Sequence, residues 1–301
     1  MISQRLRSWG RIFSVVTVIL LPQTIRAETI RIGDIGNQPT AQIKRFAPLA
    51  GYLAKQLESE GIAEGKVVVA KSISEMDTLL RQRKVDLFID SPFPVLAVSR
   101  LSGSKFLVRR WKRGLAEYHA VIFVRKDSGI GQLEDLKGKM FAFEEPFSTV
   151  TYILPKMVMV QKGLKLVQKK SAADPVAPEE VGYIFVGDDP NTMFRVLRGK
   201  TSGGVMNNQN YHREARGYLD SLKIIHETFS LPRQVVTCRA DLDPKLVARI
   251  KEILVKMDQS AEGRKVLKDF EGTTKFDEIS DQAMLSLSKL QKFIDTELGI
   301  K

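Results

Sequence analysis

Residues 84–94 read Lys-Val-Asp-Leu-Phe-Ile-Asp-Ser-Pro-Phe-Pro, an apolar strand pattern that passes directly into the start of a helix. Ser91 can cap that helix, and Pro92 suits its first turn because proline lacks the N–H that a helix start leaves unpaired. The same order occurs earlier in the chain, with strands over 28–33 and 66–70 and helices over 40–57 and 72–83. Strands that alternate with helices at this spacing predict βαβ units and a parallel sheet.

A second series of the same kind follows two strand-like segments, 106–111 and 118–125. It contains strands over 140–143, 183–186 and 203–206, and helices that begin near Thr149 and Pro190. We interpret 234–238 as a return crossing and 244–300 as helical, because its apolar residues recur at helical spacing. The predicted fold class is therefore α/β, with two lobes, each a mainly parallel sheet flanked by helices, joined by two crossings. The predicted first lobe is 28–127 with 235–301, and the second is 128–234.

The first 27 residues have the order of a secretory signal peptide. Arg5, Arg7 and Arg11 precede an apolar run over 12–21, and Ala27 offers a small residue at the cleavage position. The apolar run is shorter than the roughly 20 residues that a membrane-spanning helix needs, and a retained anchor is the alternative interpretation. The segment predicts export to the periplasm.

Composition excludes several classes of function. The net charge of +12 falls to +8 without residues 1–27, and in an exported protein this charge favours small anions over nucleic acid. The only cysteine, Cys238, excludes an internal disulfide framework. The three histidines, His119, His212 and His226, have no metal-ligand spacing, and we find no nucleophile–base pair. The sequence therefore predicts a binding protein with no catalytic residues, no metal and no cofactor.

Three predicted strand-to-helix junctions carry side chains that suit ligand binding. Ser91 lies at one, the hydroxyl pair Ser148 and Thr149 at a second, and Asp188 at a third. Each alone is typical of an ordinary helix cap, worth about 1 kcal/mol. In open α/β sheets, however, ligands lie beyond the carboxyl ends of strands, where helix N-termini present free amides. Taken together, the junctions predict an oxyanion held between the lobes.

A resemblance to a known family rests on a series of motifs in order along the chain. The motifs are 46–53 (FAPLAGYL), 84–87 (KVDL), Ser91-Pro92, 118–129 (YHAVIFVRKDSG), 133–139 (LEDLKGK), 141–143 (FAF), Pro146, Ser148-Thr149, Tyr152, Pro155 and 239–242 (RADL). In these motifs the chain resembles the PhnD-like substrate-binding proteins of phosphonate and phosphate ABC transporters. The resemblance covers nearly the whole chain after residue 27.

The resemblance implies a type 2 periplasmic binding protein, a Venus flytrap fold that closes around a small anion. It further implies a membrane ABC permease as partner and a monomeric chain. Ser148 and Thr149 match the turn that holds phosphonate oxygens in the family, and Ser91 matches the first-lobe helix terminus. Tyr118 falls at the first crossing, where an aromatic ring can line the cleft, and Asn37 and Gln38 fall in the usual ligand-facing loop.

The chain also departs from the family pattern. Val150 takes the place of a third hydroxyl, Glu144 and Glu145 precede the anion-binding turn, and Asn207 stands where relatives have an acid. A carboxylate beside an oxyanion site is either turned outward or paired with a cationic part of the ligand. We therefore expect an oxyanion, with an organic one that carries an amine or a hydroxyl, or a different small solute, as open alternatives. The alternative function is a periplasmic sensor of the same fold that signals to a membrane kinase.

Overall fold

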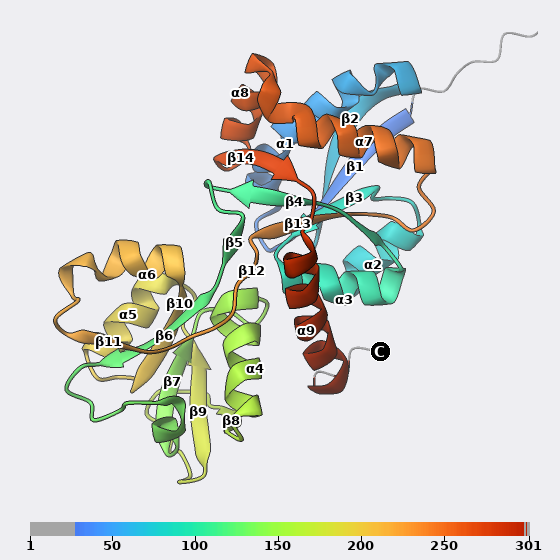
Figure 1. Ribbon diagram of the computed structural model, residues 1–301. Coiled ribbons are helices and arrows are strands. Elements are labelled where there is room, and N and C mark those ends of the chain that lie inside the picture. Colours follow the sequence, from blue (N-terminus) through green and yellow to red (C-terminus); the bar gives the residue numbers. More distant parts are fainter. Residues whose placement is uncertain (1–27, 298, 300–301) are drawn as a thin grey trace, which may run out of the picture.

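The computed structural model describes residues 28–297 and residue 299, and it contains two separate six-stranded sheets (Figure 1). Helices flank both sheets, so the predicted two-lobed α/β architecture is confirmed. The predicted signal peptide, residues 1–27, lies outside the described residues. Within the described part of the chain, no helix combines the length and apolar character that crossing a membrane requires.

The first sheet has the strand order β14-β4-β13-β3-β1-β2. Its strands are β1 (Glu28–Ile35), β2 (Ile62–Ala70), β3 (Leu87–Asp90), β4 (Lys105–Lys112), β13 (Gln234–Cys238) and β14 (Thr273–Asp277). Strands β2, β1, β3 and β4 run in one direction, and β13 and β14 run in the other. The helices of this lobe are α1 (Pro39–Gln56), α2 (Ile73–Arg81), α3 (Pro92–Ser102), α7 (Pro244–Lys256) and α8 (Ala261–Asp269).

Helix α1 lies directly against the edge strand β2. Phe46, Leu49 and Leu53 form its buried face, as their spacing predicts, whereas Ile43 is exposed. A Cβ atom at Gly65 of β2 would lie 2.0 Å from the carbonyl oxygen of Ala50 in α1. Only glycine permits this close approach of helix and strand.

The second sheet has the strand order β11-β6-β10-β7-β9-β8. Its strands are β6 (Ala120–Arg125), β7 (Lys139–Phe143), β8 (Lys165–Gln168), β9 (Glu180–Phe185), β10 (Gly203–Asn207) and β11 (Leu222–Glu227). Strands β7, β8, β9 and β10 are parallel, and β6 pairs antiparallel with both β10 and β11. One turn of π-helix (Thr149–Ile153) leads into α4 (Leu154–Gln161), and α5 (Asp189–Leu197) and α6 (Asn208–Glu214) complete the lobe.

The crossings between the lobes are β5 (Glu117–Tyr118) and β12 (Leu231–Pro232), which pair with each other. The predictions differ from this arrangement in one lobe limit and in the position of one crossing. Strand β6, placed in the first lobe by the limit at residue 127, belongs to the second sheet. Strand β13, interpreted as the return crossing, lies inside the first sheet between β4 and β3, and each of its residues is buried.

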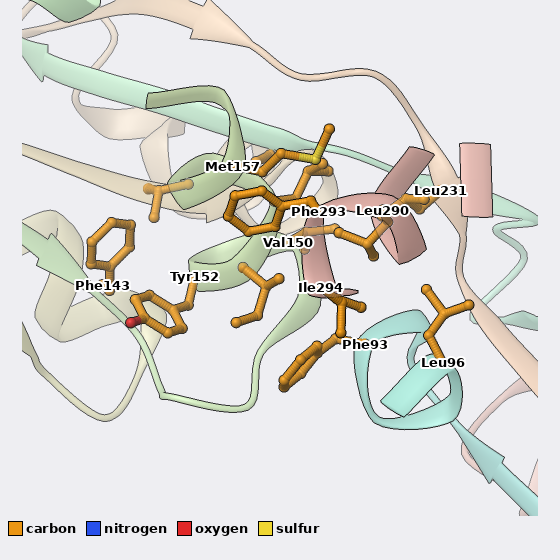
Figure 2. Close-up of a cluster of buried hydrophobic side chains, with 14 of the residues drawn as sticks. Phe93, Leu96, Phe143, Val150, Tyr152, Met157, Leu231, Leu290, Phe293 and Ile294 are labelled. Carbon is orange, nitrogen blue, oxygen red and sulfur yellow. The ribbon is translucent and has the colours of Figure 1, made fainter. Parts of the chain in front are cut away.

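Helix α9 (Asp281–Glu297) joins the two lobes on one side (Figure 1). It follows β14 of the first sheet and packs against α3, β12 and α4. Figure 2 shows its apolar face within a cluster that takes side chains from both lobes. The cluster includes Phe93 and Leu96 from α3, Val150, Tyr152 and Met157 from the second lobe, and Leu290, Phe293 and Ile294 from α9.

Candidate ligand-binding site

The two lobes meet where α3 begins. Ser91 is the N-cap residue of α3, but its side chain makes no capping hydrogen bond within the helix. The backbone N–H of Phe93 instead donates a hydrogen bond of 2.9 Å to Oγ1 of Thr149, the first residue of the π-helical turn in the second lobe. A hydroxyl of one lobe thus satisfies a free amide at a helix start of the other.

Tyr118 and Arg233 lie at the two crossings beside this contact. Tyr118 is buried, and the guanidinium carbon of Arg233 lies 4.4 Å from the centroid of its ring. Burial raises the pKa of Tyr118, and the charges of Arg233 and Asp90 act on it in opposite directions. Within the described residues, no carboxylate lies within ion-pair distance of Arg233. Arg233 therefore supplies an uncompensated cation at the junction of the lobes.

Two carboxylates lie at the carboxyl ends of neighbouring strands in the first lobe, Asp34 on β1 and Asp90 on β3. Burial raises the pKa of Asp34 to about 6, against the effect of a 2.6 Å hydrogen bond from Nε2 of Gln42. Burial, together with the charge of Asp34, raises the pKa of Asp90 to about 8. Burial of Asp90 therefore favours the neutral form of its carboxyl group.

Strand β4 carries cationic side chains next to these carboxylates. Burial, together with the cations of Arg110 and Arg233, lowers the pKa of Lys112 to about 8, against the opposing effect of Glu271. Glu271 pairs with Lys112 at 3.0 Å and with Arg110 at 3.1 Å. Three cations, Arg110, Lys112 and Arg233, thus lie close together in this part of the first lobe.

On the second lobe, a carboxylate occupies the turn that the resemblance assigns to an oxyanion. Oγ1 of Thr151 donates a hydrogen bond of 2.5 Å to Oε2 of Glu144, and Oγ1 of Thr151 also contacts Oγ of Ser148. The Ser148 hydroxyl additionally accepts a hydrogen bond from the N–H of Thr151, which makes it the cap of this turn. Glu144 is half-buried, whereas Glu145 is exposed. Of the two carboxylates before the turn, Glu144 is thus the one that packs against the protein, and Glu145 faces solvent.

Asp189, at the start of α5, lies close to Glu144. Burial raises the pKa of Glu144 to about 7, and the charge of Asp189 is the next largest cause. Burial also raises the pKa of Asp189, whose Oδ2 accepts a hydrogen bond from Nδ2 of Asn210. Asn207 is buried and caps α6 by accepting a hydrogen bond from the N–H of Asn210.

The structure brings some of the predicted site residues together and leaves others apart. Tyr118 and Thr149 meet at the junction of the lobes, and Ser148 lies beside Glu144. The hydroxyl of Ser91 bonds instead to Oδ1 of Asp90 in its own lobe. Asn37 and Gln38 are exposed before α1, where the backbone of Gln38 bonds to Gln42. Sequence reasoning did not single out Arg233, Lys112, Asp34 or Asp90, and it treated Asp189 only as part of a capping segment. Position at the end of an apolar strand was the one local signal available for Asp34 and Asp90.

The raised pKa of Glu144 predicts a pH-dependent stability. A carboxyl group whose pKa rises on folding from 4.5 to about 7 favours the folded state below its unfolded pKa, and this contribution is lost as pH rises through 7. We expect Glu144→Gln to raise the free energy of unfolding at pH 8 by on the order of 2 kcal/mol and to have little effect below pH 5. Urea unfolding at both pH values measures this, and equal effects at both would contradict it.

Comparison with known proteins agrees with a two-lobed binding protein. The sequence pattern of a family described as "ABC transporter, phosphonate, periplasmic substrate-binding protein" matches residues 36–284. The chain belongs to this family, whose members are substrate-binding proteins of ABC transporters.

Solved structures share the fold. The protein XAC2383 from Xanthomonas citri, solved with a chloride ion and with ATP, has TM-scores of 0.81 and 0.80. It is 25% identical, and each match covers 89% of this chain and 97% of that chain. PhnD1 from Prochlorococcus marinus, solved in complex with methylphosphonate, has a TM-score of 0.62 at 18% identity, with 90% of this chain and 99% of that chain covered. The binding-protein component PA3383 of a phosphonate ABC transporter from Pseudomonas aeruginosa has a TM-score of 0.60 at 20% identity, over 91% of this chain and 89% of that chain.

Proposed function

We propose that this protein is the periplasmic solute-binding component of an ABC importer and that it captures a small oxyanion between its two lobes. The observation that carries the proposal is Arg233, a cation without a carboxylate partner in the described structure, over Tyr118 and at the junction of the lobes. A free cation on a positively charged background attracts anions. The Xanthomonas citri relative has been solved with chloride and with ATP, which are both anions.

The residues around Arg233 can bind an oxyanion without any covalent chemistry. The guanidinium group provides charge and paired N–H donors that fit the geometry of phosphonate, phosphate or carboxylate oxygens. The N–H of Phe93 and the hydroxyl of Thr149 satisfy each other in this structure. An anion that enters there replaces their single hydrogen bond with one to each donor. Because the donors come from both lobes and from a crossing, the bound anion favours closure of the lobes.

Substitution of Arg233 tests the site. We expect Arg233→Gln to weaken binding of the tightest oxyanion by at least about tenfold, because a hydrogen bond to a charged group contributes about 1.5 to 3 kcal/mol. The measurement is calorimetric titration with phosphate, phosphite, methylphosphonate, sulfate and acetate. Arg216→Gln, at an exposed arginine of the second lobe, is the matched control for the loss of one positive charge. Equal affinities for wild type and the Arg233 variant would remove this assignment.

Uptake by cells tests the role in import. If the protein serves a permease, cells that lack it lose uptake of the radiolabelled ligand, and the Arg233→Gln variant does not restore it. If uptake is unchanged while a cellular response to the ligand disappears, the sensing alternative is the correct one.

A further inference from the structure

The sheet of the second lobe has one face toward the first lobe and one face away from it. On the outer face, helices α5 and α6 pack their apolar residues with Val121 and Phe123 of β6. Ile122 and Val124, on the other side of the same strand, belong to the cluster that contains α4 and α9. Figure 1 accordingly shows α5 and α6 on the side of the second lobe that lies away from α9. The outer surface of these two helices therefore faces away from the first lobe.

Three large apolar side chains are exposed on this outer side. Phe194 of α5 and Tyr218 are each 37% exposed, and Leu219, which follows Tyr218 in the turn before β11, is 57% exposed. The rings of Phe194 and Tyr218 meet edge to face, with their centroids 6.0 Å apart. We call Phe194, Tyr218 and Leu219 the outer patch. Exposed apolar side chains that cluster in this way, rather than lie singly, mark a surface that contacts another molecule or a membrane.

Cationic side chains surround the outer patch. The guanidinium carbon of Arg198 lies 5.7 Å from the centroid of the Phe194 ring, and Arg195 follows Phe194 in α5. Lys126 lies beside the turn of Leu219, because its backbone N–H donates a hydrogen bond of 2.9 Å to the carbonyl of Ser221. In the described part of the chain, none of these three cations lies within ion-pair distance of a carboxylate.

The acidic residues nearby do not cancel this charge. Two neighbouring ion pairs are neutral, Arg125 with Asp127 and Arg213 with Glu214. Asp220 lines a groove with Lys126 next to the turn, and Asp188 caps the opposite end of α5. Three cations against Asp220 leave the surface around the outer patch positively charged.

An anionic lipid surface fits this combination of groups. Lysine and arginine are attracted to anionic headgroups, and phenylalanine, tyrosine and leucine enter the boundary between headgroups and acyl chains. The residues of the outer patch project from a helix and a turn, so they can enter a fluid surface. The groove beside the turn favours an acidic peptide less, because Asp127 and Asp220 line it together with Arg125 and Lys126.

We propose that the outer patch and the cations around it bind this protein to a membrane surface that contains anionic phospholipids. The proposal goes beyond the oxyanion site and does not depend on it, because the outer patch lies on the face of the second lobe that is turned away from the first. Binding of this kind holds an exported protein close to a permease in the same membrane.

Co-sedimentation with lipid vesicles tests the proposal. The probes are vesicles of phosphatidylcholine alone and vesicles with equal parts of phosphatidylcholine and phosphatidylglycerol. For the exported protein purified from the periplasm, we expect at least about tenfold tighter binding to the anionic vesicles. Raising the salt to about 0.5 M should release the protein, because salt screens exposed charges.

Single substitutions test whether the outer patch and its cations are the surface that binds. Arg198→Gln should weaken binding to the anionic vesicles about fivefold, as expected for one cation near such a surface. Leu219→Ser should weaken it by a similar factor, because the leucine side chain no longer leaves water on binding. Arg264→Gln on α8 and Leu285→Ser on α9 are the matched controls at exposed residues and should stay within about twofold of wild type.

Each other outcome overturns the proposal. Equal binding to both kinds of vesicle would show that anionic lipid is not recognised, and unchanged binding of Arg198→Gln and Leu219→Ser would show that another surface is responsible. If the vesicles do not bind while a soluble glutamate-rich peptide binds wild type but not Arg198→Gln, the surface serves an acidic protein segment instead. Calorimetric titration of the same variants with oxyanions, expected to match wild type, keeps this result separate from the proposed function.

Discussion

Glu271→Gln is expected to lower the free energy of unfolding by about 3 kcal/mol at pH 7, because it removes one partner of a buried ion pair. The side chain of Arg110 is fully buried in the first lobe, and its Nε–H also donates a hydrogen bond of 2.8 Å to Oγ1 of Thr273. Glu271 is its carboxylate partner at 3.1 Å and is also within 3.0 Å of Lys112. The variant leaves the Arg110 charge in the core without a countercharge, which costs far more than the loss of a surface pair.

The pH dependence of this effect has a definite sign. Burial alone would raise the pKa of Glu271, but the cations of Lys112 and Arg110 outweigh it and lower the pKa to about 2. A carboxyl group with a lowered pKa stabilises the fold above its unfolded pKa of 4.5, and that stability is lost as pH falls toward 2. The difference between wild type and Glu271→Gln should therefore be largest above pH 5 and shrink toward pH 3.

Urea unfolding of both proteins at pH 7 and at pH 3.5 measures this difference. The control is Glu262→Gln, which removes an exposed pair with Lys55 and should cost less than about 1 kcal/mol. If the two variants lost similar amounts of unfolding free energy, the buried ion pair would not be a major source of stability in the first lobe.

The parallel strands at the centre of each sheet could be predicted from sequence, as could the edge strand β2, whereas the other edge strands could not. Strands β1, β3, β7 and β9 are each followed by a helical segment and have apolar runs that the pattern locates directly. Strands β8, β11 and β14 lie at sheet edges, have mostly half-buried or exposed residues, and so carry a weak periodic signal. Strand β14 lies within 244–300, which its apolar spacing predicts to be helical throughout, and this prediction is wrong.

The residues of the candidate site also fall into two groups, those that the sequence could identify and those that it could not. Ser91, Ser148 and Thr149 could be found because a helix cap is a local feature of the sequence. The proposed role of Arg233 depends on its position over the ring of Tyr118, which belongs to the other crossing. No local sequence pattern predicts that the two residues are close. For Glu144 and Glu145, sequence alone left both orientations open. The half-buried carboxylate of Glu144, which accepts a hydrogen bond from Thr151, is distinguished from the exposed Glu145 only by the folded turn.

Phe293→Ala in α9 is expected to have the other largest effect, a loss of about 3 to 4 kcal/mol in the free energy of unfolding. The ring of Phe293 is 5% exposed, and in Figure 2 it lies beside Met157 and Val150 of the second lobe, while Ile294 of the same helix lies near Phe93 of the first. Removing the ring leaves a cavity where the cores of the two lobes join, and the surrounding helices can collapse into it only partly.

The loss should also weaken the attachment of one lobe to the other, because α9 packs against both α3 and α4. Leu285→Ala, at a residue of the same helix that is 52% exposed, is the matched control and should change stability by less than about 0.5 kcal/mol. Urea unfolding measures the loss, and small-angle X-ray scattering measures whether the molecule expands. If Phe293→Ala were as stable as Leu285→Ala and equally compact, α9 would cover the surface of the lobes without joining their cores, and closure around a ligand would have to depend on the paired crossings β5 and β12 alone.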